Sequence, residues 1–199
     1  MSANGLSQTN LPRTDLIVWD LEFTSWEGAQ ARDWSGPGEE KEIVQIGAVR
    51  LSPTFEEIAA FDLLVLLRLN PILSDYFKAL TGLSQERLEA DGVSWPEALS
   101  RFSAFCHGAG LILANGSDGE VLERNCDLWH MPSLIPLERF RSLRPALEAK
   151  LGQGVSSGAI AGLLGLDKVG AAHDGLADAR NVALALRHYG QDWLVEALS

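Results

Sequence analysis

The stretch IVWDLEFTSW, residues 17–26, is an apolar run that contains two carboxylates, Asp20 and Glu22. Because side chains alternate across a strand, these two share one face with Leu16 and Val18. At a separation of roughly 6 to 7 Å and an effective dielectric of about 20, their repulsion costs about 2 to 3 kcal/mol. The pair therefore indicates either a solvated strand end or a site that holds cations.

Three more residues have types and positions that favour chemistry. Asp118 follows the apolar run 110–115 and begins the next predicted helix, where it would ordinarily serve as an N-cap. Asp178 lies four residues before Val182 on the inward stripe of the last helix, although the helix dipole alone favours an acid there. His173, five residues earlier, has the ordinary interpretation of a structural loop residue.

The crevice at the carboxyl ends of strands is where α/β sheets bind ligands, so the four acids are predicted to converge there. Carboxylates without cysteine are hard oxygen ligands that suit Mg²⁺ or Mn²⁺. Such a cluster fits two ions about 3.5 to 4 Å apart that assist phosphoryl displacement. Histidine titrates near neutral pH, so His173 is predicted to take the proton of the attacking water.

Several predicted elements must position these residues. The first strand is followed by a long Gly-rich and charged surface loop over residues 25–42. Two strands then complete an antiparallel meander, and helices alternate with further strands up to a closing helix. The predicted strands are 42–51, 61–69, 110–115 and 134–140, and the predicted helices lie within 72–92 (two, broken at Thr81-Gly82), 94–108, 116–129, 142–152, 156–165 and 174–190.

This order predicts an α/β fold with a mixed central sheet of about five strands and helices on both faces. At 199 residues we expect one domain, over residues 14–199, after a flexible N-terminal leader of residues 1–13. The leader lacks the organisation of a signal peptide, and no stretch reaches the 18 apolar residues of a membrane span. We therefore expect a cytoplasmic protein without a membrane partner.

The net charge of −11 disfavours a broad grip on long nucleic acid through its phosphates. A basic stretch at 138–150 offers a local contact, or else it is a solvated helix face. Cys106 and Cys126 lack CxxC spacing and are predicted to be packing residues. The basic residues concerned are Arg139, Arg141, Arg144 and Lys150, with Lys168 and Arg180 further along the chain.

The ordered set of motifs resembles the DEDDh exonucleases, a branch of the ribonuclease H-like superfamily. The resemblance covers about residues 14–190, and segments 42–51, 73–92 and 173–183 resemble the eri-type subgroup, whose members trim RNA 3′ ends. It is carried by D-x-E at Asp20 and Glu22, the central Asp118, and H-x4-D at His173 and Asp178.

The resemblance implies a ribonuclease H-like fold and stepwise hydrolysis from a free RNA or DNA 3′ end, with release of nucleoside 5′-monophosphates. It implies that His173 is the general base and that Phe23 and Thr24 contact the terminal nucleotide. We expect Arg141 and Arg144 to bind substrate as well. The residues expected to ligate two Mg²⁺ or Mn²⁺ ions are Asp20, Glu22, Asp118 and Asp178.

The second motif departs from the family pattern, because Ser117 stands where an aromatic residue normally precedes the Asp. Asp127 therefore stays open as the alternative to Asp118. Asp174 is a second acid near Asp178, but only Asp178 has the H-x4-D spacing and faces inward.

Three functions remain in competition. The leading hypothesis is a metal-dependent 3′-5′ exonuclease that acts on single-stranded RNA or short oligonucleotides. A DNA exonuclease of the proofreading type shares the motifs, and a catalytically silent nucleic-acid-binding module shares the fold. The presence of all five catalytic-type residues argues against the silent module, and the oligomeric state stays open.

Overall fold

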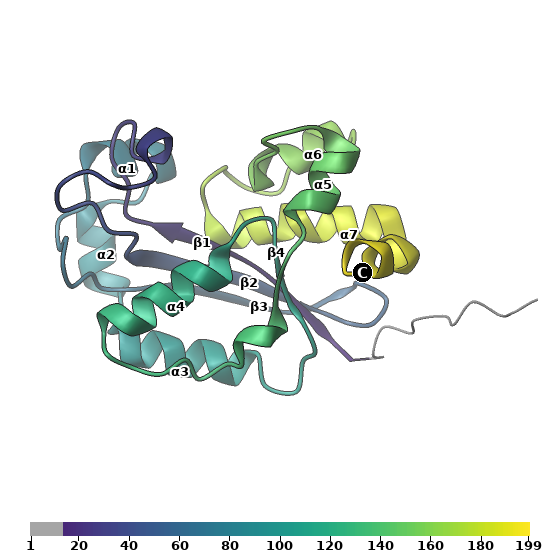
Figure 1. Cartoon of the computed structure of the whole chain (residues 1–199), viewed down its shortest axis with the longest axis horizontal. Coiled ribbons are helices and arrows are strands. Elements are labelled where there is room, and N and C mark those ends of the chain that lie inside the picture. Colours follow the sequence, from purple (N-terminus) through teal and green to yellow (C-terminus); the bar gives the residue numbers. More distant parts are fainter. Residues whose placement is uncertain (1–13) are drawn as a thin grey trace, which may run out of the picture.

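A mixed five-stranded sheet organises residues 14–199, the part of the chain that the computed structural model describes (Figure 1). The leader predicted over residues 1–13 lies outside the described residues. The strand order is β3-β2-β1-β4-β5, with β1 at the centre. The strands are β1 (Leu16–Phe23), β2 (Ile43–Leu51), β3 (Glu57–Leu64), β4 (Ile112–Ala114) and β5 (Phe140–Ser142).

Strand β1 is antiparallel to β2 and parallel to β4, as the sequence predicted for the meander and the later strand. Its register sets Asp20 opposite Gly47 and Glu22 opposite Gln45. The mixed sheet of five strands confirms the predicted fold class.

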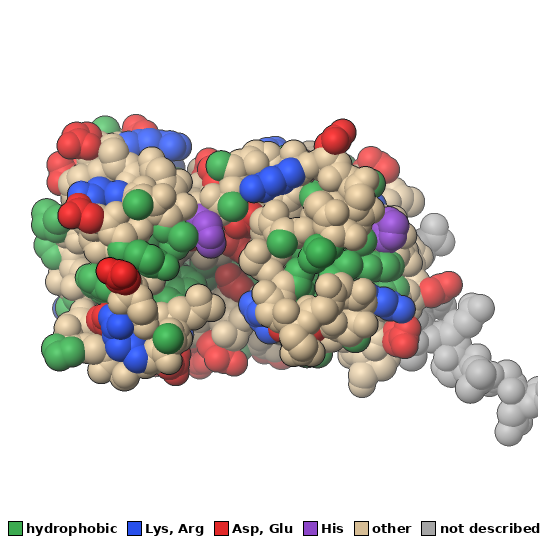
Figure 2. Space-filling model, turned by 90° about the horizontal axis from the view of Figure 1, so that it is seen from above, with side chains coloured by type: hydrophobic (Ala, Val, Ile, Leu, Met, Phe, Trp, Pro, Cys, Tyr) green, Lys and Arg blue, Asp and Glu red, His purple; other side chains and the backbone are tan. Residues whose placement is uncertain are grey.

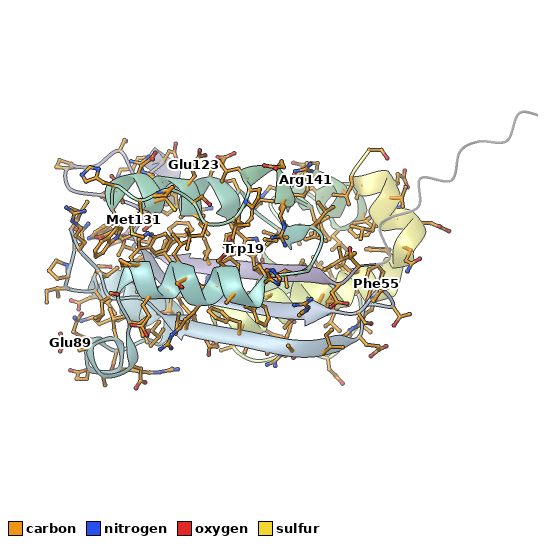
Figure 3. All side chains as sticks on the ribbon, turned by 90° about the horizontal axis from the view of Figure 1, so that it is seen from below. Trp19, Phe55, Glu89, Glu123, Met131 and Arg141 are labelled. Atoms are coloured by element: carbon orange, nitrogen blue, oxygen red, sulfur yellow. The ribbon has the colours of Figure 1, made fainter. Side chains whose placement is uncertain are left out.

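Helices cover both faces of the sheet because β1 is apolar on both. Ile17 and Trp19 belong to a core under two helices, and Figure 3 shows Trp19 between them and the sheet. Leu16 and Val18 belong to a second core, together with Phe55, on the opposite face. The first core is covered by α3 (Trp95–Phe105) and α4 (Asp118–Leu128), the second by α5 (Arg144–Leu151), α6 (Ile160–Leu163) and α7 (Gly175–Ala197).

Helices α1 (Asp75–Thr81) and α2 (Gln85–Asp91) pack around a third, smaller core at one end of the sheet. Gly82 separates them in a left-handed conformation, φ 73°, which confirms the predicted break. Helix α7 contains non-helical Gly190 at the predicted helix end and continues beyond it to Ala197. No helix within residues 14–199 has the length and apolar character that a membrane span requires.

Two strands differ from their predicted bounds. The third strand was predicted at 61–69, but β3 starts at Glu57, directly after the turn from β2, because its exposed half is paired with β2. It ends at Leu64. The Val65 N–H still donates to the Val44 carbonyl of β2, whereas the Leu66 N–H donates to the Val93 carbonyl and those of residues 68–70 donate to the Glu42 carboxylate.

The last strand was predicted at 134–140, but β5 spans only Phe140–Ser142. Pro136 supplies no N–H for a strand ladder, and Leu137–Arg139 form a 3-10 turn. Within this segment Ile135 is buried, whereas Leu134 and Leu137 are exposed, and the strand begins only at Phe140.

Candidate active site

Five predicted residues meet in one cavity of about 640 Å³ at the end of β1. We call Asp20, Glu22, Asp118 and Asp178 the acidic cluster; all four line the cavity, as does His173. In Figure 1 the end of β1 lies between α1 on one side and α5 to α7 on the other. Figure 2 shows acidic side chains in a hollow of the surface, with a histidine beside it.

Helix α4 brings Asp118 to the central strand. Its Oδ1 accepts a hydrogen bond of 3.0 Å from the backbone N–H of Leu21, which lies between the two carboxylates of β1. Asp118 is the first residue of α4, where the helix dipole favours negative charge. The missing aromatic residue before it therefore does not keep Asp118 from the acidic cluster.

The start of α7 brings in the remaining acid and the histidine. The Asp174 side chain caps the helix by accepting from the Ala177 N–H at 2.9 Å, so this acid is engaged in capping. His173 lies just before the helix in a left-handed conformation, φ 59°, and its N–H donates to Asp178 Oδ2 at 3.0 Å. Ligand atoms of Glu22, His173 and Asp178 all lie within 4.8 Å of one another.

Ser157 is a site residue to which the sequence analysis assigned no role. Its buried hydroxyl donates to Asp20 Oδ1 at 2.9 Å, and Asn115 Nδ2 donates to Ser157 Oγ at 3.4 Å and to the Val155 carbonyl at 2.9 Å. Ser157 therefore orients one oxygen of Asp20. No local pattern distinguishes this serine, because its partner lies 137 residues away.

Burial is the largest cause of raised pKa values throughout the acidic cluster. It raises the pKa of Glu22 to about 8 and that of Asp118 to about 6. The pKa of Asp178 is raised, and that of Asp20 lies well above its usual range, with neighbouring acids adding to the effect for Asp20 and Glu22. Few cationic side chains line the cavity to offset the repulsion between the acids. The site therefore favours a bound cation.

The donor set fits hard divalent metal ions. All four acids offer carboxylate oxygens, the ligands that Mg²⁺ and Mn²⁺ prefer. Asp178 Oδ1 is buried and has no hydrogen-bond partner among residues 14–199. A buried carboxylate oxygen without a partner costs free energy unless a bound ligand interacts with it. The predicted Mg²⁺ or Mn²⁺ ions are therefore compatible with the chemistry of the acidic cluster and stay a prediction.

The predicted substrate contacts separate into two groups. Phe23 and Arg144 line the cavity, and the charge of Arg144 lowers the pKa of Asp118 against the effect of burial. Thr24 and Arg141 do not line it. Asp127, the alternative ligand, is exposed on α4 and also lies outside the cavity.

Thr24 is occupied by internal hydrogen bonds. Its hydroxyl donates to the Glu40 carbonyl and accepts from the Glu42 N–H, while its own N–H donates to the Glu42 carbonyl. Its carbonyl accepts from Trp34 Nε1 at 3.0 Å. Because every polar group of this buried residue has an internal partner, Thr24 fixes the segment after β1, and its contact with a nucleotide stays a prediction.

Arg141 lies outside the cavity of the acidic cluster. Its guanidinium donates to the carbonyls of Glu138 and Phe140, and the side chain borders a separate cavity of about 200 Å³ beside Trp19 and Glu123 (Figure 3). Arg144, by contrast, is the first residue of α5 and lines the cavity of the acidic cluster. Substrate binding by Arg141 and Arg144 therefore stays a prediction.

The sequence matches the Exonuclease family (RNase_T) over residues 17–186, a range that contains the acidic cluster and His173. Because the match spans most of its length, the chain belongs to the exonuclease family. Within it, the ordered motifs relate the chain to the eri-type DEDDh 3′-5′ exonucleases, which confirms the predicted resemblance.

A curated relative is similar over part of the chain. ERI1 exoribonuclease 2 of Xenopus laevis is 34% identical over 91 residues, which are 45% of this chain. The match covers 12% of that relative, so the chain spans only a small part of its length.

Solved structures share the fold. The nuclease domain of 3′hExo, a DEDDh family member bound to rAMP, has a TM-score of 0.73 at 22% identity and covers 91% of this chain and 94% of its own. Exonuclease I of E. coli in complex with a dA16 oligonucleotide has a TM-score of 0.65 at 14% identity, with coverage of 87% and 40%. S. pombe Pop2p with Mg²⁺ and Mn²⁺ bound has a TM-score of 0.66 at 12% identity, with coverage of 88% and 82%.

Proposed function

We propose that this protein is a metal-dependent 3′-5′ exonuclease that hydrolyses single-stranded RNA or short oligonucleotides and releases nucleoside 5′-monophosphates. The observation that carries the proposal is the convergence of four carboxylates and one histidine in a single cavity. Membership of the exonuclease family supports it, and so does the eri-type relative. The structural similarity to solved nucleases, at low sequence identity, supports the fold alone.

The acidic cluster would hold two Mg²⁺ or Mn²⁺ ions. Bound there, such ions supply Lewis acidity that activates a water and stabilises the leaving oxygen in a phosphoryl displacement. The orphan Oδ1 of Asp178 and the raised pKa values of the acids support this assignment, because an ion would satisfy the first and offset the second.

His173 would act as the general base. Its imidazole borders the cavity beside Glu22 and Asp178 and can accept the proton of a water positioned there. That water oxygen forms a bond to the phosphorus of the terminal linkage, and the bond from phosphorus to the 3′ oxygen breaks. The terminal nucleotide leaves with a 5′-phosphate, and the shortened strand keeps a 3′-hydroxyl.

The charge of the molecule supports short or single-stranded substrates. With a net charge of −11, the surface repels the dense phosphate array of a duplex. A single strand needs only its 3′ end in the cavity.

The decisive experiment uses matched 5′-labelled RNA and DNA, single-stranded or in duplexes with 3′ overhangs, with Mn²⁺, Mg²⁺ or EDTA. We expect a ladder from single-stranded RNA with either metal and none with EDTA. Faster shortening of DNA would favour the proofreading-type alternative. An unshortened substrate in both metals would leave a silent binding module as the better description.

A matched pair of variants tests the fourth carboxylate. Asp118→Asn should lower kcat by at least about 100-fold, because it removes the charge of a metal ligand, while the amide oxygen can still accept the Leu21 N–H. Asp127→Asn, on the exposed side of the same helix, should leave kcat within about twofold. The reverse outcome would return the ligand assignment to Asp127.

A further inference from the structure

One wall of the cavity is built by the segment between β1 and β2, residues 24–42. The sequence predicted residues 25–42 as a long surface loop. Gln30, Trp34 and Lys41 of this segment line the cavity. Among the described residues, Lys41 and Arg144 are the only Lys or Arg side chains that do so. Arg144 starts α5, so the two cations reach the cavity from different elements.

The backbone around Lys41 is fixed by buried side chains. Asn125 Nδ2 donates to the Lys41 carbonyl at 2.7 Å, and Asn125 Oδ1 accepts from the Ile43 N–H at 3.0 Å. The neighbouring Glu42 is 2% exposed, and its carboxylate accepts the N–H groups of residues 68–70 at 2.7 to 2.9 Å. Lys41 therefore enters the cavity from a rigid support.

The side chain of Lys41 is held by an aromatic surface. Its Nζ lies 4.2 Å from the centroid of the Trp34 ring, and the Phe23 ring packs edge-on against Trp34 at 5.4 Å. Trp34 and Asp33 have φ values of 50° and 48°, a conformation that is strained for a residue as bulky as tryptophan. Such strain persists where surrounding contacts maintain it, often at functional sites.

The ion pair of Lys41 is weak. Its Nζ lies 3.1 Å from Asp33 Oδ1, but the Asp33 side chain is 90% exposed. Exposed pairs of this kind contribute little to stability, so stability alone does not account for the rigid support and the strained tryptophan. The ammonium can exchange this partner for a stronger anion.

We propose that Lys41 is a substrate-binding residue: its ammonium, oriented by Trp34, contacts a phosphate of the nucleic acid strand next to the scissile one. This inference rests on the proposed function. The scissile phosphate must face the acidic cluster and its ions. The next phosphate of the strand also carries a negative charge, and the ions of the acidic cluster do not neutralise it. Lys41 is a fixed cation on the wall of the same cavity.

The test uses the single-stranded oligonucleotide that the wild-type protein shortens fastest, with KM and kcat measured at several salt concentrations. Lys41→Met removes the charge and keeps an unbranched apolar stem over Trp34. We expect KM to rise about tenfold with kcat nearly unchanged, since a hydrogen bond to a charged group contributes about this much. The slope of log KM against log salt should fall by about 0.7, the value for one phosphate of a single strand.

Three variants separate binding from a structural role. Lys41→Arg should keep most of the affinity. Asp33→Asn breaks only the ion pair and should leave KM equal or lower. Lys78→Ala is the matched control, because Lys78 forms a comparable exposed pair with Asp75 and does not line the cavity; it should change neither KM nor the slope.

A neutral methylphosphonate linkage next to the scissile one locates the contact. In the wild type it should raise KM as Lys41→Met does, and in Lys41→Met it should add little. The inference is overturned if Lys41→Met leaves KM and the salt slope unchanged, or if Asp33→Asn raises KM as much as Lys41→Met does. It is also overturned if the effects of Lys41→Met and of the methylphosphonate on KM are fully additive. Absence of any cleavage by the wild type would instead overturn the proposed function.

Discussion

At the scale of single residues, His173 combines two roles in one position. Its backbone N–H holds Asp178 Oδ2 at 3.0 Å, whereas its imidazole borders the cavity beside Glu22. The left-handed φ of 59° lets both groups face the site at once. The backbone role belongs to any residue that tolerates this conformation, and the imidazole role belongs to histidine alone.

His173→Asn separates these roles, because asparagine tolerates the left-handed region and keeps the N–H. We expect kcat to fall by about 10² to 10⁴-fold, the usual contribution of general base catalysis. The affinity for Mn²⁺, measured by calorimetric titration, should stay within about threefold. A parallel loss of Mn²⁺ affinity would show that the imidazole is a ligand instead.

At the scale of elements, the site depends on close contact between β2 and the start of α7. Gly47 pairs with Asp20 across the sheet, and a Cβ on it would lie 2.0 Å from the backbone of Gly175 and Leu176. The Gly175 N–H also donates to Gln45 Oε1 at 3.0 Å. Only glycine at position 47 allows α7 to reach β2 and place Asp178.

Gly47→Ala should therefore destabilise the protein by about 3 kcal/mol and lower activity by moving the start of α7. Urea denaturation measures the first effect and the shortening assay the second. Gly162→Ala in α6 is the control, since a Cβ there meets nothing within 4 Å, and it should be neutral or stabilising by about 1 kcal/mol. Equal behaviour of the two variants would refute this account of the contact.

At the scale of the whole molecule, the fold holds a group of buried acids whose ionisation opposes folding. The pKa of Glu22 is about 8 in the folded protein and 4.5 ordinarily, so between these values the folded state binds the extra proton. The free energy of unfolding of the metal-free protein therefore decreases as pH rises from about 4.5 to about 8. Divalent ions bound to the ionised acids would reverse this trend.

Mn²⁺ should accordingly raise the melting temperature more at pH 8 than at pH 6, where protons compete for the carboxylates. With free metal at about 100 times its Kd, we expect about 2.7 kcal/mol, or about 5 to 10 °C, at pH 8. Thermal denaturation with Mn²⁺ or EDTA measures this difference. Asp178→Asn is the control, and an equal shift in that variant or at both pH values would contradict the prediction.

The sequence by itself determined the two faces of β1, the mixed sheet and the set of motifs that the chain shares with the exonuclease family. These follow from local patterns: alternation places Asp20 and Glu22 on one face, and helical spacing turns Asp178 inward. The five residues of the site could therefore be named before the fold was known.

Only the tertiary structure decided which partners complete the site. Ser157 bonds Asp20 across 137 residues, and Asn125 bonds the Lys41 carbonyl across 84. Thr24 fits the pattern of a substrate contact but has all its polar groups bonded internally. The physical reason is that a side-chain hydrogen bond depends on where chain-distant atoms come to lie, and no local periodicity encodes that position.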